Sequence, residues 1–157
     1  MTMTKSTLES LLKKHHNEAY LWSCQCCHRQ EDDAKDVLQL VYLKVLEGKA
    51  TFKEQSSFKT WLFSVIRFTA IDHFKKQQKH VSLDGIVIVE ETKDDAEENN
   101  YRAILMQLPE RQQQILTLAF YHQMTLAEIA EVKNLHIGTV RTHYERGKEA
   151  LRKSLKK

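Results

Sequence analysis

The sequence of 157 residues has only one proline and four glycines, and its three cysteines are bunched at positions 24, 26 and 27. With so few breakers, the long polar–apolar periodic runs predict an all-α protein rather than one rich in β-turns. Three neighbouring cysteines are too few and too close for a disulfide framework. No apolar run approaches the roughly 18 residues that span a bilayer, and the N-terminus contains no apolar signal core. We therefore expect a cytoplasmic protein without membrane insertion.

Charge is distributed unevenly along the chain. Residues 1–80 carry a net charge of +4 and residues 101–157 one of +5, whereas residues 81–100 carry −6. Basic modules suit phosphate backbones, although any solvated helical surface is also charged. The acidic stretch is too polar after Glu90 to bury anything. We predict two small helical domains, residues 1–80 and residues 102–157, joined by an acidic linker over residues 81–101.

Residues 108–151 have the pattern of a helix-turn-helix. Pro109 suits a first helical turn, because its missing N–H has no partner there. Thr125 is a natural N-cap, and Glu128 three residues later completes a capping box. Asn134 lies at the turn, where a residue that tolerates positive φ is needed. A helix-turn-helix places its second helix in the major groove, so this segment predicts DNA binding.

The second helix of this segment begins at His136 or a neighbour and has two distinct faces. Its inward face is expected to comprise Val140, Tyr144, Gly147 and Leu151. Arginine pairs with guanine through two hydrogen bonds and glutamate accepts from cytosine, so base contacts are predicted for Arg141, Thr142, Glu145 and Arg146. Backbone N–H groups at a helix start meet phosphate, and the predicted DNA-binding set is completed by Gly138, Thr139, Lys148 and Thr125. An ordinary solvated face is the simpler alternative.

Three further helical segments are predicted ahead of the linker, at Leu8–Trp22, Ala34–Glu47 and Phe58–Gln78. Asp32 or Asp33 is expected to cap the second segment, and Gly48 to end it. The third segment interleaves aromatics with cations, as surfaces do that stack unpaired bases and hold the nucleic-acid backbone. Its candidate DNA-binding residues are Phe58, Lys59, Thr60, Trp61, Arg67, His73, Lys75 and Lys76. Taken one at a time, however, Trp61, Phe68 and Phe74 are more typical of a buried core.

Cys24, Cys26, Cys27 and His28 form a cluster of side chains that bind zinc or sense oxidation in other proteins. Successive helical positions point in different directions, so four ligands from so short a stretch would need an irregular backbone. Cysteine is also a frequently buried residue. We expect these residues to pack in the protein interior and to bind no metal or cofactor. Metal binding or redox sensing is the alternative.

Four motifs follow one another in a definite order: DDAKDVLQ at residues 32–39, FKTWL at 58–62, LPERQ at 108–112 and GTVR at 138–141. In this order, and over almost the whole chain, they resemble a bacterial extracytoplasmic-function sigma factor, a protein that lends RNA polymerase its promoter specificity. The resemblance implies a sigma region 2-like domain at residues 1–80 and a region 4-like domain at residues 102–157. The chain departs from the family pattern at Leu40, where an acidic residue is usual, at Phe68, where asparagine often follows the arginine, and at Lys133, where an apolar residue is usual.

The resemblance also implies roles for the candidate residues. The helix that carries Asp36 and Gln39 would dock on a coiled coil of the large polymerase subunit. The set on the third segment would melt the −10 element and hold a flipped base of the non-template strand, and the set on the last helix would recognise the −35 element. The implied partners are core RNA polymerase, double-stranded promoter DNA and the melted non-template strand. Anti-sigma factors are common further partners in this family, although nothing in the sequence names one.

Two other classes of function compete with this interpretation. A free-standing transcriptional regulator of the response-regulator type has a similar helix-turn-helix core, but it would require an α/β receiver or ligand-binding domain upstream. No acidic phosphoacceptor pattern after a strand appears in this sequence. An enzyme is not expected, because no paired carboxylates, Gly-rich phosphate loop or nucleophile–base motif stands out.

Overall fold

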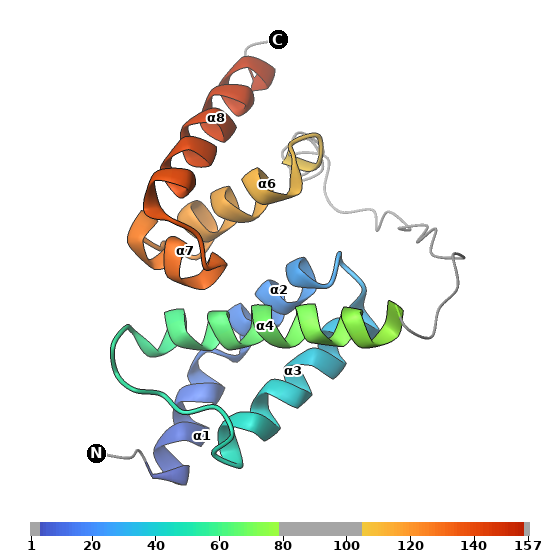
Figure 1. Ribbon diagram of the computed structural model, residues 1–157, viewed down its shortest axis with the longest axis vertical. Helices are drawn as coiled ribbons and strands as arrows, with labels where there is room; N and C mark the ends of the chain where they lie inside the picture. Colours follow the sequence, from blue (N-terminus) through green and yellow to red (C-terminus); the bar gives the residue numbers. More distant parts are fainter. Residues whose placement is uncertain (1–3, 79–104, 156–157) are drawn as a thin grey trace. The chain divides into compact units, whose positions relative to one another are not determined.

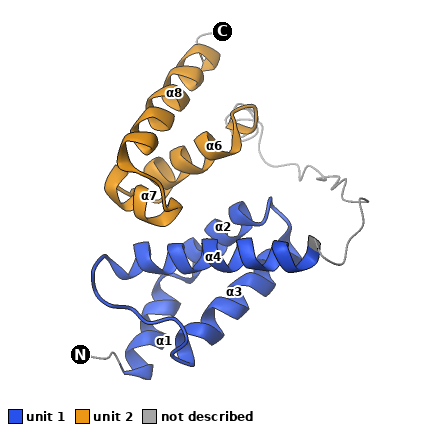
Figure 2. Ribbon diagram, in the orientation of Figure 1, with its two compact units in different colours: residues 1–89 blue, residues 90–157 orange. Residues whose placement is uncertain are grey.

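The computed structural model describes residues 4–78 and 105–155, and the chain divides into two compact units, residues 1–89 and residues 90–157 (Figure 2). Regular secondary structure is helical throughout these described ranges, which confirms the predicted all-α class. In the same ranges no helix is long and apolar enough to cross a membrane. The acidic linker predicted over residues 81–101 lies outside the described residues.

Over residues 4–78, unit 1 contains four helices, shown in blue to green in Figure 1: α1 (Lys5–Lys14), α2 (His16–Cys26), α3 (Glu31–Leu46) and α4 (Phe58–Gln78). The stretch predicted to be helical over residues 8–22 forms parts of two helices, because the chain is interrupted at His15, which has φ −100° and ψ 9°. The prediction for α4 is confirmed residue for residue.

The start of α3 also differs from its prediction. The helix begins at Glu31 after the N-cap Gln30, so Asp32 and Asp33 lie in its first turn rather than at the cap. Carboxylates in a first turn are stabilised by the positive end of the helix dipole. Gly48 follows the C-cap with φ +78°, a conformation that favours glycine. Its predicted role as the helix stop is therefore confirmed.

The core of unit 1 is built where α2, α3 and α4 pack against one another. Trp22 is fully buried and stacks on Phe63, with ring centroids 5.7 Å apart. Its indole N–H donates to the Phe63 carbonyl at 3.1 Å, so the buried polar atom is satisfied. The Ser23 hydroxyl donates to the Ala34 carbonyl at 2.8 Å. These contacts tie α2 to both α4 and α3.

Unit 2 contains α6 (Glu110–Leu116), the short π-helix η1 (Thr117–Tyr121), α7 (Leu126–Lys133) and α8 (Ile137–Leu155). Pro109 is the N-cap of α6 with an extended ψ of 144°, so its predicted place inside the first turn is wrong by one residue. The last helix starts next to His136 as predicted. In Figure 1 α8 is the long helix that ends at the C-terminus, and it contacts both α6 and α7.

The inward face of α8 is largely confirmed. Val140, Gly147 and Leu151 are buried, whereas Tyr144 is only half-buried. A Cβ atom added at Gly147 would lie 2.9 Å from Cδ1 of Leu116, which is inside normal contact distance. Gly147 therefore allows α8 and α6 to approach each other closely. Lys133, on α7, is buried and donates a hydrogen bond to the Gln114 side-chain oxygen.

Candidate nucleic-acid interfaces

Both ends of α7 have the local geometry that the sequence predicts. The Glu128 N–H donates to the Thr125 hydroxyl at 3.1 Å, and the Thr125 N–H donates to the Glu128 carboxylate at 3.0 Å. The predicted capping box is thus confirmed. Asn134 ends α7 in the left-handed conformation with φ +53° and ψ +49°. The capping box therefore fixes the start of α7, and Asn134 turns the chain from α7 toward α8.

The outward face of α8 gathers the residues predicted to read base edges. Arg141, Thr142, Glu145 and Arg146 are all exposed on this helix. The helix carries five Arg or Lys side chains and two Glu side chains, so its face is net basic. A basic helix face backed by a buried apolar face suits insertion beside phosphates. The structure therefore brings these four residues together on one accessible surface.

The helix start offers fewer free groups than its sequence suggests. The Gly138 N–H donates to Nδ1 of His136 at 3.1 Å, and the Gly138 carbonyl accepts from the Thr142 hydroxyl at 3.0 Å. A phosphate at this position would have to replace His136 as the partner of that N–H. Thr139 is half-buried here, and Thr125 is exposed but engaged in the capping box.

Lys148 and His143 are two further ionisable side chains of α8. Lys148 lies 3.5 Å from the Glu145 carboxylate and 4.5 Å from the Tyr144 ring centroid. His143 is half-buried, and its pKa is lowered from 6.5 by burial first, and then by the positive charges of Arg111 and Arg146. Burial and like charge both disfavour the imidazolium. We therefore expect His143 to be neutral at pH 7.

In unit 1 the predicted −10 residues fall into two groups. Phe58 and Thr60 are buried, with exposed fractions of 8% and 0%. A direct contact with DNA would require these two side chains to move, and their assignment stays a prediction. The half-buried or exposed members are Lys59, Trp61, Arg67, His73, Lys75 and Lys76.

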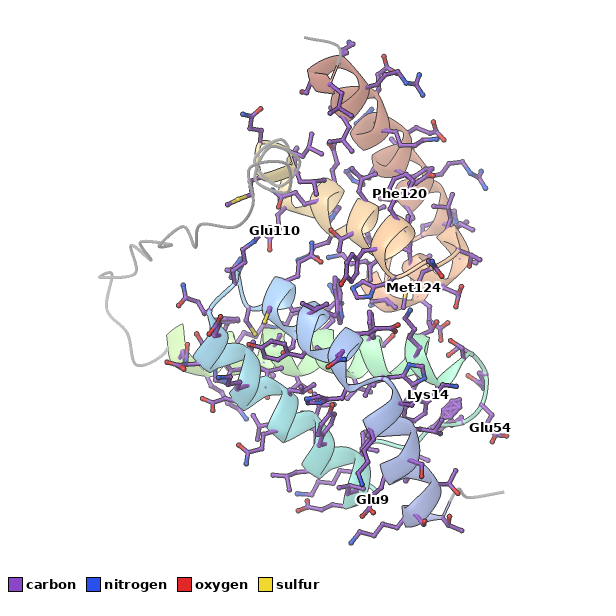
Figure 3. The ribbon with its side chains drawn as sticks, turned by 180° about the vertical axis from the view of Figure 1, so that it is seen from behind. Glu9, Lys14, Glu54, Glu110, Phe120 and Met124 are labelled. Atoms are coloured by element: carbon purple, nitrogen blue, oxygen red, sulfur yellow. The ribbon has the colours of Figure 1, made fainter. Side chains whose placement is uncertain are left out.

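The loop before α4 is held by aromatic packing. Phe52 lies 5.6 Å from Phe58 and 5.4 Å from Trp61, measured between ring centroids, and Phe58 lies 5.5 Å from Trp61. Glu54, labelled in Figure 3, lies on this loop with a positive φ of 59°. Phe52 was not among the residues predicted to have a structural or functional role. Because edge and tilted ring contacts are favourable, Phe52 fastens the loop to the start of α4.

Several basic side chains of α4 contact carboxylates. Lys59 lies 2.9 Å from Glu18 of α2, and Nε2 of His73 lies 2.9 Å from Asp33 of α3. These contacts join the helices of unit 1. Lys76 pairs with Asp72 one turn earlier at 3.2 Å. Lys75 is exposed.

Phe68 is the clearest departure from the sequence analysis on this helix. Its assignment to the core is wrong, because 55% of the residue is exposed. Phe74, by contrast, is half-buried and lies 5.7 Å from the His28 ring. Phe68 was not among the predicted site residues, although it alternates with cations as they do.

The predicted polymerase-binding residues lie on the exposed side of α3. Asp36 and Gln39 are both exposed, and Leu40 beside them is 42% exposed. Gln39 also lines an apolar groove of about 370 Å³ between α2 and α3. The other lining residues are His16, Tyr20, Lys35, Leu38, Tyr42, Leu43 and Leu46. This helix therefore presents a mixed polar and apolar surface.

The cysteine cluster lies at the end of α2. Burial raises the pKa of the Cys27 thiol to about 12, and burial also raises the pKa of Cys24. Thiols with raised pKa values stay protonated at neutral pH, and protonated thiols are poor nucleophiles and poor metal ligands. Within residues 4–78 and 105–155, no group of three or more His, Cys, Asp or Glu residues is placed to hold a metal ion.

Comparison with known proteins matches both units. The family model described as "Sigma-70 region 2" matches residues 11–80, and the one described as "Sigma-70, region 4" matches residues 98–151. The RNA polymerase sigma factor SigV of Bacillus subtilis (strain 168) is 29% identical, over 98% of this chain and 94% of that protein. The ECF RNA polymerase sigma factor SigW of the same organism is 27% identical, over 84% of this chain and 82% of that protein.

Solved structures share the fold. The sigma factor RpoE, in its co-crystal structure with the anti-sigma factor NepR from Bartonella quintana, aligns with a TM-score of 0.73 at 18% identity, covering 96% of this chain and 97% of that chain. CnrH in complex with the cytosolic domain of CnrY aligns with a TM-score of 0.66 at 18% identity, covering 98% and 90%. The two region matches and the curated relatives place the chain among the sigma-70 transcription initiation factors. It belongs to the extracytoplasmic-function family of sigma factors.

Proposed function

We propose that this chain binds core RNA polymerase and directs it to promoters, with each unit reading one promoter element. The observation that carries this proposal is a polar, cation-bearing helix face in each unit, backed by a buried core. These helices are α8 in unit 2 and α4 in unit 1, both labelled in Figure 1. Matches to regions 2 and 4 of one family support the same division. The polymerase carries out the chemistry, so the proposal requires no catalytic residue or cofactor in this chain.

Recognition of the −35 element is assigned to the outward face of α8. Arg141 and Arg146 can each contact guanine in the major groove, and Glu145 can accept from cytosine. The exposure of all three supports the assignment. Gly138, Thr139 and Lys148 lie on the same helix and are assigned to phosphates.

Melting and capture of the −10 element are assigned to α4 and the loop before it. Trp61, Arg67 and Lys75 are accessible there, and base stacking combined with cationic contacts offsets the few kcal/mol that unpairing a base costs. Asp36 and Gln39 on α3 are assigned to the polymerase. Because the polymerase acts in the cytoplasm, we propose that this protein acts there too.

Reconstitution with sigma-free core polymerase tests the proposal as a whole. We expect a stable complex and transcripts from promoter-bearing DNA of the source genome. Absence of both would leave a free-standing helix-turn-helix DNA binder, which the family matches do not favour. Asp36→Ala should weaken core binding, whereas Glu9→Ala, which removes a carboxylate from the exposed side of α1 (Figure 3), should not.

A matched pair of arginines on α8 tests the −35 assignment. Arg146→Ala should weaken recognition by roughly 1–3 kcal/mol and relax base preference at one position. Arg152→Ala removes the same charge two turns nearer the end of the helix, where Arg152 lies 3.5 Å from Glu149. It should change affinity less and leave base preference intact. Equal effects of the two changes on base preference would remove Arg146 from the reading face.

A further inference from the structure

His143 lies on the side of α8 that packs toward α6, beside the predicted reading face. Helices α6 and α8 contact each other and are both labelled in Figure 1. Gly147, four residues after His143 and on the same face of α8, packs against Leu116 of α6. Arg146 is the exposed neighbour of His143 on α8, and Arg111 lies in the first turn of α6. Arg111, His143 and Arg146 are called the basic cluster below.

The charges that act on His143 are both positive. Burial is the largest cause that lowers the pKa of His143 from 6.5, and the charges of Arg111 and Arg146 lower this pKa further. Nδ1 of the ring is buried and has no hydrogen-bond partner within residues 4–78 and 105–155. Burial, like charge and the absence of this hydrogen bond all disfavour an imidazolium in the free chain.

The acidic side chains of the surrounding helices are exposed to solvent or have contacts outside the basic cluster. These contacts are Glu145 with Lys148 and Glu149 with Arg152 on α8, and Glu110 with Gln114 on α6, while on α7 Glu128 forms the capping box and Glu131 is exposed. Lys133 of α7 is a further cation, and it contacts Gln114. The basic cluster therefore keeps a positive charge that an anion can neutralise.

The anion that suits this edge of α8 is a DNA phosphate. A half-buried histidine between two helices is often a simple packing residue. His143 differs because its charged neighbours are two arginines, and arginine is well suited to bind phosphate. A helix that reads bases in the major groove lies between two lines of phosphates, and groups at its flanks contact them. The basic cluster lies at such a flank of the proposed reading helix.

We propose that Arg111 and His143 bind a phosphate of the DNA backbone beside Arg146, and that His143 takes up a proton from solvent as this phosphate binds. The affinity of unit 2 for DNA then rises as the pH falls. This inference rests on the proposed role of α8 in −35 recognition. It adds two residues and a pH dependence to that role.

The direction of the pH dependence follows from the two states of His143. A phosphate next to the imidazole favours the charged form, so the pKa of His143 is higher in the complex than in the free chain. Between these two pKa values the free chain is neutral at His143 and the complex is protonated. Affinity therefore rises as the pH falls, by at most about tenfold per pH unit for one proton. Below the pKa of the free chain both states are protonated, and the dependence ends.

Binding of the full-length chain to a fluorescently labelled, mixed-sequence DNA duplex tests the inference, because phosphate contacts do not depend on sequence. Affinity is measured at constant ionic strength between about pH 8 and pH 5, the range in which histidine titrates. Wild-type affinity should rise several-fold as the pH falls. His143→Asn, which is never charged, should keep the weaker affinity at every pH. His143→Arg, which is always charged, should bind tightly at every pH.

His16→Asn is the matched control, because it removes an exposed histidine from α2 in unit 1. It should keep the wild-type pH dependence. Nuclear magnetic resonance of the histidine Cε1–H signals gives a second measurement on the unmodified chain, in which the duplex should raise the pKa of His143. Arg111→Gln should raise this pKa in the free chain. Inorganic phosphate should raise it less than the duplex does, and an equal rise would overturn the assignment to DNA.

Three results would each overturn the inference: a wild-type pH dependence in His143→Asn, a pKa of His143 that the duplex does not raise, and equal affinities of the asparagine and arginine variants at pH 8. Core assembly and transcription are measured on the same proteins, so the two hypotheses fail separately. A chain that assembles and transcribes without this pH dependence keeps the proposed function and loses the inference. A chain that shows the pH dependence but never assembles with core polymerase does the reverse.

Discussion

Gly147 is a small residue of α8 packed against Leu116 of α6, and the change Gly147→Ala probes how tightly the recognition helix is seated. The added Cβ would lie 2.9 Å from Cδ1 and 3.2 Å from Cγ of Leu116. Leu116 is itself only 1% exposed, so it has little room to rotate away. The helices must therefore shift slightly or the leucine must adopt a strained rotamer.

Two opposing effects set the magnitude. Overpacking a closely packed core costs about 1–3 kcal/mol, whereas alanine is favoured over glycine inside a helix by about 1 kcal/mol. We expect Gly147→Ala to destabilise unit 2 by about 1 kcal/mol. Leu116→Ala alone should cost about 2–5 kcal/mol. In the double variant the new methyl group occupies part of the vacated space. The loss of stability in the double variant should therefore be smaller than the sum of the losses in the two single variants.

Urea unfolding followed by circular dichroism and by tryptophan fluorescence measures this effect. Both tryptophans, Trp22 and Trp61, lie in unit 1, so their fluorescence reports that unit. The loss of stability in unit 2 should appear as a shift of the circular dichroism transition to lower urea, without a matching shift in tryptophan fluorescence. An unchanged fluorescence transition is the internal control.

A Gly147→Ala variant that is more stable than the wild type by about 1 kcal/mol, the full difference in helix propensity, would contradict this prediction. That result would mean that Leu116 moves aside without cost. Strictly additive losses in the double variant would equally contradict direct contact between positions 116 and 147.

Two further predictions concern the same unit. Thr125→Ala removes one bond of the capping box with Glu128 and should cost about 0.5–2 kcal/mol of stability, whereas Thr125→Ser should restore most of it. Because the pKa of His143 is lowered in the folded state by burial and by Arg111 and Arg146, the unfolded chain takes up the proton first as pH falls. The unfolding free energy of unit 2 should therefore decrease as the pH falls from 6.5, the ordinary pKa of histidine, to the lower pKa of His143 in the folded protein. Replacing His143 with asparagine should flatten this part of the stability–pH curve, and an unchanged slope would show that other groups are responsible.

The features predicted correctly from sequence depend on residues close together in the chain. The capping box joins Thr125 and Glu128, and the left-handed turn needs only Asn134 itself. The bounds of α4 likewise follow from local periodicity. Such interactions span a few residues, so the pattern alone carries them.

The features that sequence reasoning missed depend on distant residues. Asp32 or Asp33 was expected to cap α3, but neither does, and Asp33 contacts His73 of α4, forty residues later in the chain. Phe52 was not singled out from the sequence, but it packs on Trp61. Phe68 was considered a core residue. Because α4 carries large apolar side chains on both sides, the sequence pattern does not distinguish its buried side from its exposed side.

The sequence by itself determined the helical class, the helix-turn-helix and the order of motifs that identifies the family, because each depends on local periodicity or on residue identity. Only the tertiary structure decided which side of each helix is covered. Burial depends on which helices pack together: α4 lies against α2 and α3, and α8 against α6 and α7. That packing leaves Phe68 and the Arg141–Arg146 face accessible while it encloses Thr60 and Lys133.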